Sequence, residues 1–224
     1  MIVVNHFKTL LVLVWAILSI GCSNVSTSAQ DTLSPALFRA ASDGNLSKVQ
    51  DLLNAGANVN VREEEGETPL MYAAAAGKTE IINLLLERGA DIRALSLNKE
   101  TALARAVGAK QYDSVKLLLD RGADIERSTT ASGPPLIYAA GNNDLRMLKL
   151  LLERGAGPNS KDEEGNSALI AAAENNASVE LVRVLLIAGA DPNVKNQKGE
   201  RPYEIVVRNN NQGLADLLKN VSRP

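Results

Sequence analysis

The dipeptide Gly-Ala returns at a nearly constant interval and constrains the fold of this chain more than any other feature. It occurs at steps of 33, 33, 33 and 34 residues, at Gly56-Ala57, Gly89-Ala90, Gly122-Ala123, Gly155-Ala156 and Gly189-Ala190. A fixed period of this length is typical of stacked structural units, each of which contacts only its neighbours. The sequence therefore predicts a solenoid.

A second marker recurs in phase with the first and indicates where each unit begins. Thr68, Thr101 and Ser167 can cap a helix, and Pro69 suits the first helical position because an N–H there has no partner. The Gly of each Gly-Ala follows an apolar run, where a residue without Cβ can close a helix in the left-handed conformation. Polar residues after Gly-Ala suit a turn. Each unit is therefore expected to form a helix, a turn, a second helix and a hairpin.

These markers together resemble the ankyrin repeat. The resemblance is clearest from Thr68-Pro69-Leu70 through Gly77 to Gly89-Ala90-Asp91, and it extends over about residues 31 to 224. It implies an all-α solenoid of about six helix-turn-helix units with short hairpin loops, in a domain over 32–224. The expected units are approximately 32–64, 65–97, 98–130, 131–163, 164–197 and 198–224.

The sequence departs from the repeat pattern at several positions. The His that usually follows Thr-Pro-Leu is replaced, by Met71 in the second unit for example. The hairpin Gly of other units is Lys99 in the third and Ser132 in the fourth, so we expect irregular hairpins there. An extra residue, Ala177 or a neighbour, lies between the helices of the fifth unit. The last unit resembles a terminal cap, with the run Asn209–Gln212 facing water.

Leucines recur at equivalent places in the second helices, and we expect them to form one continuous core. Because buried leucines lose both transfer free energy and packing when truncated, each Leu to Ala change should cost about 2 to 5 kcal/mol. The set comprises Leu84, Leu85, Leu117, Leu118, Leu150, Leu151, Leu185 and Leu186.

The N-terminal segment has the pattern of an export signal. An apolar run over Leu10–Ile20 follows a short segment with one Lys, and it is too short to cross a bilayer. Leu18-Ser19-Ile20-Gly21-Cys22 resembles the bacterial lipobox, although its Leu lies one place further from Cys22 than usual. We therefore expect a lipoprotein-type signal peptide over 1–22, lipidation of Cys22 and a polar tether over 23–31.

Two destinations remain open for the exported protein. Ser23 after the Cys resembles the pattern of lipoproteins sent to the outer membrane, which favours an anchored protein facing the periplasm. Cleavage near Thr27-Ser28-Ala29, a site of small residues, would instead give a soluble periplasmic or secreted protein.

Composition disfavours several classes of function. His6 and Cys22 are the chain's sole His and Cys and lie in or at the edge of the leader, so we expect no catalytic residues, metal site or cofactor in the folded body. Without Lys8, 23 basic residues face 26 acidic ones, which disfavours nucleic acid as a partner. Acidic residues cluster in two runs, Glu63–Glu67 and Asp162–Glu164. Neither run has the ligand spacing of a calcium loop, so both are interpreted as solvated hairpin tips. Their negative charge would attract a basic partner.

Large side chains recur two positions after the marker leucines and form a candidate binding stripe. The column contains Arg39, Tyr72, Arg105 and Tyr138, followed by Ala171 and Ile205, and small residues lie one turn later. Tyr and Arg are enriched where binding energy concentrates, so the four large residues are expected to contact a partner. In the alternative, Tyr72 and Tyr138 pack between units while Arg39 and Arg105 stack on them as a cation–π ladder.

The resemblance implies a non-enzymatic interaction module of the bacterial cell envelope, which binds a protein partner through the concave surface of the array. Glu67 and Glu100, at matching hairpin positions, are further candidate contacts. An immunity or inhibitor protein that neutralises a periplasmic toxin or enzyme is the alternative. A distant alternative is a hydrolase that uses Glu67 and Glu100, because equivalent residues of neighbouring units lie about 10 Å apart. No small-molecule substrate is expected.

Overall fold

The computed structural model describes residues 26–127 and 133–221, which form twelve helices and no β-strand. The predicted all-α solenoid is confirmed. The helices are α2 (Ser26–Asp43), α3 (Leu46–Asn54), α4 (Pro69–Ala75), α5 (Thr79–Glu87), α6 (Ala102–Gly108), α7 (Tyr112–Asp120), α8 (Pro135–Gly141), α9 (Leu145–Glu153), α10 (Ala168–Glu174), α11 (Val179–Ile187), α12 (Pro202–Arg208) and α13 (Gln212–Val221).

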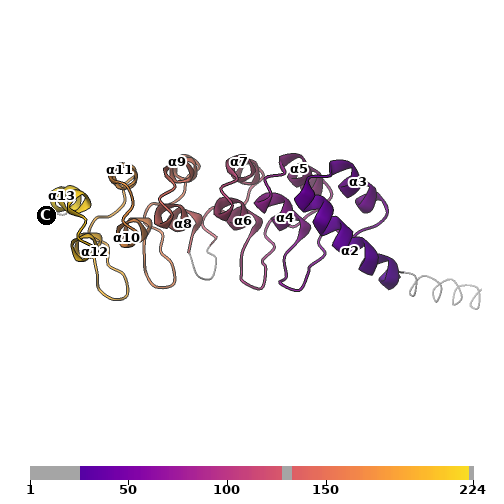
Figure 1. The fold of residues 1–224 in the computed structure, drawn as a ribbon, viewed down its shortest axis with the longest axis horizontal. Coiled ribbons are helices and arrows are strands. Elements are labelled where there is room, and N and C mark those ends of the chain that lie inside the picture. The colour runs from indigo at the N-terminus through magenta and orange to yellow at the C-terminus, as the bar shows by residue number, and fades with distance from the viewer. Residues whose placement is uncertain (1–25, 128–132, 222–224) are drawn as a thin grey trace, which may run out of the picture.

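The helices form two layers, and the hairpins project from one of them. The first helices of the units, α4, α6, α8, α10 and α12, lie in a row beneath the second helices, and the hairpin loops extend from the side of the first row (Figure 1). Four leucines of the second helices, Leu85, Leu118, Leu151 and Leu185, are completely buried. Leu150 is also buried, whereas Leu84, Leu117 and Leu186 pack against the core from half-buried positions. The predicted leucine core therefore runs through the array.

Local residue chemistry starts and ends the helices as the sequence predicts. The side-chain oxygens of Thr68, Thr101 and Ser167 each accept a hydrogen bond from the backbone N–H three residues later. Pro69 occupies the first turn of α4, where no N–H is needed. Gly89 has a φ of 87°, a left-handed conformation that ends α5 and turns the chain toward the next unit.

The first helix begins earlier than its marker predicts. The repeat domain was expected from residue 32, but α2 is helical from Ser26 and contains Pro35 in its interior. The segment 23–31, expected to be a tether, is therefore helical from Ser26. Leu33, which lies in this additional helical stretch, packs against the core.

The hairpin of the third unit is regular, so the predicted irregularity there is wrong. Lys99 adopts a φ of 56° and donates its N–H to the Ser96 carbonyl at 2.9 Å, as Gly66 does to Glu63. The left-handed conformation costs a residue with Cβ about 1 to 2 kcal/mol, which the surrounding hairpin hydrogen bonds tolerate. Ser132 lies outside the described residues.

The extra residue of the fifth unit and the terminal cap have defined roles. Ala177 is buried, and the Ser178 side chain caps α11 by accepting the N–H of Leu181. Asn209 was expected to face water, but its amide donates to the Ala173 and Glu174 carbonyls of the preceding unit. The cap is therefore fastened by side-chain hydrogen bonds as well as by apolar packing.

Packing between units is weakest at the middle of the array. α6 and α8 contact each other much less than α4 contacts α6 or α8 contacts α10, and the contact of α7 with α9 is also sparse. We call this boundary between the third and fourth units the junction. Within the described ranges, no helix is both long enough and apolar enough to cross a membrane.

Candidate protein-binding face

The exposed sides of the first helices and the hairpin tips together form what we call the hairpin-side face (Figure 1). Arg39 and Tyr138 are exposed on it, while Tyr72 and Arg105 are half-buried. Ala171 and Ile205 are buried, so the predicted stripe of large side chains ends in the fourth unit. The role of these residues in partner binding stays a prediction.

Arg105 connects the hairpins of two units through its guanidinium group. Its Nε lies 3.0 Å from Oε1 of Glu67, and its Nη1 lies 3.3 Å from Oε2 of Glu100. The Nε contact is an ion pair without hydrogen-bond alignment, whereas the Nη1 contact is also a hydrogen bond. The structure thus brings together three residues that the sequence predicted as separate candidate contacts.

The alternative of a cation–π ladder on the stripe is wrong for both arginines. Arg39 pairs with Asp43 at 3.7 Å, and Arg105 is held by its two carboxylates. Tyr72 packs against the Phe38 ring, with centroids 5.3 Å apart. Carboxylates within reach offer each guanidinium a charged partner, which attracts it more strongly than the face of a neutral ring.

The N-terminal part of this face carries an excess of negative charge. Burial raises the pKa of Glu67, and Glu63, Glu100 and Glu65 raise it further, while Arg105 opposes them. Burial also raises the pKa of Tyr72, as does a hydrogen bond between its hydroxyl and the Glu63 carboxylate. Because Glu67 and Glu100 converge on one guanidinium, they neutralise it and do not face each other as a free acid and base.

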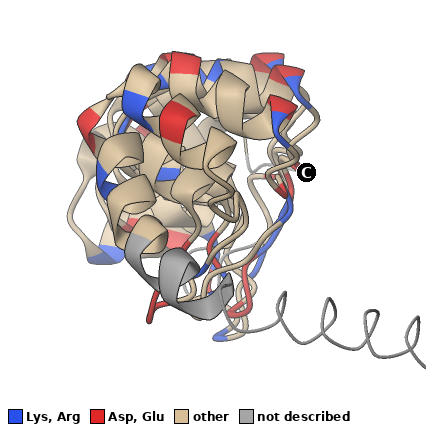
Figure 2. Cartoon of the chain, turned by 90° about the vertical axis from the view of Figure 1, so that its right-hand side faces the viewer, with Lys and Arg blue, Asp and Glu red and all other residues tan. Residues whose placement is uncertain are grey.

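A large hollow, which we call the N-terminal hollow, lies between α2 and the first hairpin. Its volume is about 840 Å³, and its wall combines the Phe38 and Tyr72 rings with charged side chains. Figure 2, a view onto the N-terminal end of the array, shows charges of both signs spread over the helices and hairpins. The remaining lining residues are Ser34, Pro35, Arg39, Ser42, Asp43, Val61, Arg62, Glu63, Glu64 and Glu65.

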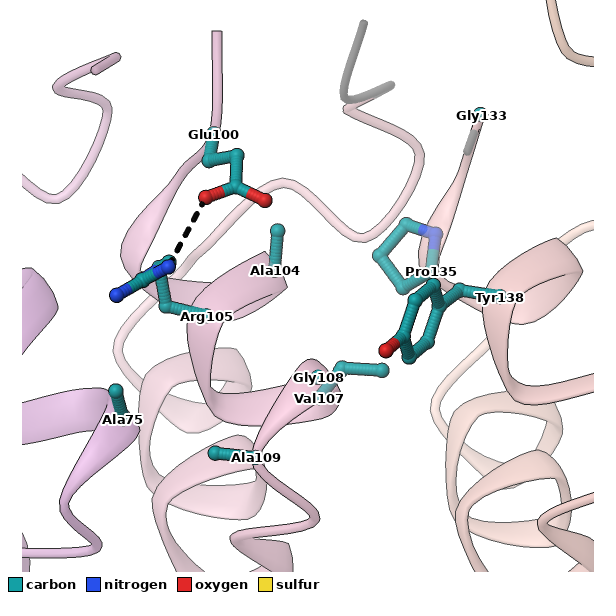
Figure 3. A pocket seen from close by; sticks show the side chains of 10 residues that line it. All are labelled: Ala75, Glu100, Ala104, Arg105, Val107, Gly108, Ala109, Gly133, Pro135 and Tyr138. Carbon is teal, nitrogen blue, oxygen red and sulfur yellow. Dashed lines mark hydrogen bonds and ion pairs between the residues drawn. The ribbon is translucent and has the colours of Figure 1, made fainter. Parts of the chain in front are cut away.

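A second hollow, which we call the junction pocket, opens between α6 and α8 and measures about 340 Å³. Glu100 and Arg105 line one side, and Pro135 and Tyr138 line the other (Figure 3). An ideal Cβ at Gly108 would lie 3.8 Å from the Tyr138 hydroxyl, so a larger residue at this position would narrow the space. The other lining residues are Ala75, Ala104, Val107, Ala109 and Gly133.

Sequence reasoning missed several contributors to this face. Leu97 is 73% exposed at the tip of the hairpin before α6, where the hairpins before α4 and α10 carry Glu64 and Glu163. A comparison of tip positions at the repeat period would have identified Leu97. Phe38 and Pro135 give no comparable signal, because their importance depends on which helices lie beside them.

The structure contains no evidence of a metal centre in the part it describes: no group of three or more His, Cys, Asp or Glu residues is arranged to hold an ion there. The lipidation candidate Cys22 lies outside the described residues. The hairpin-side face with its two hollows is the candidate binding site.

Comparison with protein families and solved structures places this geometry among known arrays. A family model for ankyrin repeats (three copies) matches residues 37–129 and again residues 134–222, on either side of the junction. No curated protein sequence matches the chain significantly.

Three solved structures resemble the described fold. A chain from the complex of the predatory endopeptidase Bd0816 of Bdellovibrio bacteriovorus with the immunity protein Bd3460 is 30% identical, with a TM-score of 0.75 over 83% of this chain and 97% of that one. An ankyrin repeat domain from Acinetobacter baumannii AYE is 26% identical, with a TM-score of 0.74 over 82% and 96%. The ankyrin repeat domain of Bcl-3, of the IkappaB family, is 27% identical, with a TM-score of 0.68 over 82% and 97%.

Proposed function

Because this chain belongs to the ankyrin repeat family, whose members are protein-interaction modules, we propose that it is a non-enzymatic binding module of the bacterial cell envelope. Its protein partner docks on the hairpin-side face. The observation that carries this proposal is the exposure of Leu97 and Tyr138 on that face beside two hollows. Exposed large apolar side chains next to concave surface are typical of interaction sites.

The proposal is tested by capture of partners from envelope extract with wild type and two matched variants. Leu97→Ser removes an apolar side chain from a hairpin tip, and Ile187→Ser removes one that is 86% exposed at the end of α11, in the other layer. We expect wild type and Ile187→Ser to retain the same partner and Leu97→Ser to lose at least most of it. Equal retention by Leu97→Ser would place the interface elsewhere on the array.

A second candidate function is an immunity or inhibitor protein. It is favoured by the 30% identical neighbour from a complex that joins an endopeptidase to an immunity protein, with almost the whole of that chain covered. If this chain acts in the same way, its captured partner is an enzyme whose activity falls in proportion to added chain and reaches a minimum near equimolar amounts. A captured enzyme with unchanged turnover would favour a scaffold.

We propose in addition that the protein is exported and anchored to the outer membrane through Cys22, facing the periplasm. Cleavage before Cys22 would keep all described residues of α2, Ser26–Asp43, in the mature chain, whereas cleavage near Ala29 would remove the first of them. Intact mass measurement of the mature protein separates these outcomes. The anchored form starts at Cys22 and carries diacylglycerol, and Cys22→Ser abolishes the added mass. A mature chain that starts near Gln30 and carries no lipid would indicate a soluble protein.

A further inference from the structure

The junction pocket exists because neighbouring units separate at this point and no side chain of the described residues fills the space. α6 and α8 make sparse contact, and the surface between them consists largely of small residues such as Ala104, Gly108 and Ala109. At the next boundary α8 and α10 pack closely, and a Cβ placed at Gly141 would lie 3.5 Å from the Asn175 side chain and 3.9 Å from Ala171. The junction therefore offers a pocket at the boundary where the first helices of neighbouring units contact each other least.

The two walls of the pocket have chemistry that complements a cation. One Glu100 oxygen contacts Arg105, and the other points toward the open space in front of Tyr138 (Figure 3). Tyr138 is 37% exposed, so its ring is accessible from the pocket. A lysine or arginine head group placed there would meet a carboxylate on one side and an aromatic ring on the other.

The local charge favours a cation as the occupant over an anion or an apolar side chain. Arg105 is shared by Glu67 and Glu100, so the three groups together carry one net negative charge when the carboxylates are ionised. An anion would meet this excess, and an apolar side chain would strip water from Glu100 without offering it a partner. A cationic side chain neutralises the excess and replaces the lost water.

The occupant belongs to a polypeptide because the charge continues along the same face. Glu63, Glu64 and Glu65 border the N-terminal hollow, and Leu97 projects from the hairpin tip between this hollow and the pocket. Successive units thus offer acidic groups at intervals to a chain that runs across the hairpin tips. A solitary small cation would use only one of these features.

We propose that the junction pocket receives a lysine or arginine side chain from a basic, extended segment of the protein partner, between Glu100 and Tyr138. This inference rests on the proposed binding function and specifies the chemistry of its partner. It assigns Glu100 the ionic contact and Tyr138 the cation–π contact. Arg105 acts as a positioning residue that holds the Glu100 carboxylate at the rim.

The test uses a defined probe, the acetylated and amidated pentapeptide Gly-Ala-Lys-Ala-Gly, with the same peptide carrying acetyl-lysine as its neutral control. Titration into the ¹⁵N-labelled protein, followed by amide chemical shifts, reports both affinity and location. We expect saturable shifts for the amides of Glu100, Gly108 and Tyr138 with the lysine peptide, and at least fivefold weaker binding of the acetyl-lysine peptide.

Three variants make the test specific. Glu100→Gln and Tyr138→Leu should each weaken the lysine peptide at least threefold, the second without any change of charge. Glu200→Gln is the matched control, because Glu200 occupies the same position in the last unit and also pairs with an arginine, Arg208; it should bind as wild type does. The far-ultraviolet circular dichroism of each variant verifies that the helices persist.

Several outcomes would overturn the inference. Shifts that spread over all acidic tips and do not depend on Glu100 would indicate unspecific attraction. Equal binding of the lysine and acetyl-lysine peptides would indicate an apolar site. An absence of chemical-shift changes would indicate that no site exists. Capture of the native partner separates this inference from the proposed function. A partner retained by wild type and equally by Glu100→Gln would leave the binding module standing and remove the cationic contact, whereas no partner on wild type would contradict the proposed function.

Discussion

At the scale of single residues, Arg105 shows how position in the array decides the behaviour of a side chain. Its charge is satisfied by carboxylates of two hairpins, so it stabilises the contact between units while leaving the face net negative. The side chain is still about one-third exposed, so solvent screening keeps its stabilising effect modest. The residue is therefore both structural and part of the surface that a partner would meet.

Glu67 predicts a pH dependence whose sign follows from its raised pKa. The folded state binds this proton more tightly than the unfolded chain does, so ionised Glu67 lowers the free energy of unfolding at pH above its folded-state pKa. This penalty disappears as the pH falls below the pKa of the unfolded chain. We expect the stability of Glu67→Gln relative to wild type to increase between about pH 4 and about pH 7.

Urea denaturation at a series of pH values measures this difference. Glu163→Gln, which removes an exposed tip carboxylate, is the control and should show a smaller change over the same range. A stability difference between Glu67→Gln and wild type that stays constant with pH would show that burial does not disfavour the ionised carboxylate.

Leu118 predicts a large loss of stability on truncation because it is completely buried in α7. Leu118→Ala should lower the free energy of unfolding by about 2 to 5 kcal/mol, since the cavity between units cannot close fully. Leu97→Ala removes the same atoms from a 73% exposed side chain and should change stability by less than about 0.5 kcal/mol. Chemical denaturation of both variants tests the pair, and similar losses would contradict the described burial.

At the scale of elements, short helices depend on the residues that begin and end them. α4, α6, α8, α10 and α12 each span seven residues, too few to be stable alone, so caps and packing on both sides maintain them. The side chains of Thr68, Thr101 and Ser167 supply caps, whereas Pro134 precedes α8 without a side-chain cap. The start of α8 in the fourth unit is therefore maintained by tertiary packing and not by a side-chain cap.

The hairpin before α6 predicts a stabilising substitution. Lys99 holds a φ of 56° at the place where the hairpin before α4 has Gly66. Lys99→Gly should raise the free energy of unfolding by up to about 1 kcal/mol, because relief of the left-handed strain exceeds the added flexibility of glycine in the unfolded chain. Lys99→Ala keeps Cβ and should give no such gain in urea denaturation; an equal gain would point to the lysine side chain as the source of the effect.

At the scale of the whole molecule, the junction divides the array into two blocks, helices α2 to α7 and helices α8 to α13. Each unit of a repeat array contacts only its neighbours, so a sparse boundary transmits less stability from one block to the other. The junction thus combines the weakest packing with the pocket proposed to bind a partner.

Hydrogen exchange measured by mass spectrometry tests this division. Leu151→Ala, in α9, should speed exchange in α8 to α13 by at least about tenfold while α2 to α7 change much less, because the sparse junction uncouples the blocks. Leu118→Ala should give the reverse pattern. Equal acceleration of both blocks by either variant would show that the array unfolds as one cooperative unit.

The repeat architecture, the order of its helices and most helix ends could be predicted from the sequence, because these features depend on interactions within a unit. Thr101 caps the N–H three residues later, and Gly89 takes the left-handed conformation that closes α5. Neither interaction depends on the neighbouring units. The helical conformation of residues 26–34 was not predicted, because the repeat markers carry no information about residues that precede the first unit.

The candidate site was predictable only in part. Arg105, Tyr138, Glu67 and Glu100 were identified as surface candidates from their recurring positions, but their relationships were not. The alternative in which Arg105 stacks on a tyrosine was wrong, because two carboxylates on neighbouring hairpins lie within reach of it. Such distances depend on how each unit is rotated and spaced against the next.

The sequence by itself determined that this chain forms a repeat array, where most of its helices begin, and which leucines build the core. Period, caps and apolar spacing suffice for this because they describe contacts that every unit repeats. Only the tertiary structure decided that α6 and α8 separate, that Glu67 and Glu100 share Arg105, and that a pocket opens beside Tyr138. These features arise where the repetition is imperfect. Units differ slightly in side-chain volume and charge, and these differences change the spacing between units only when the units are packed together.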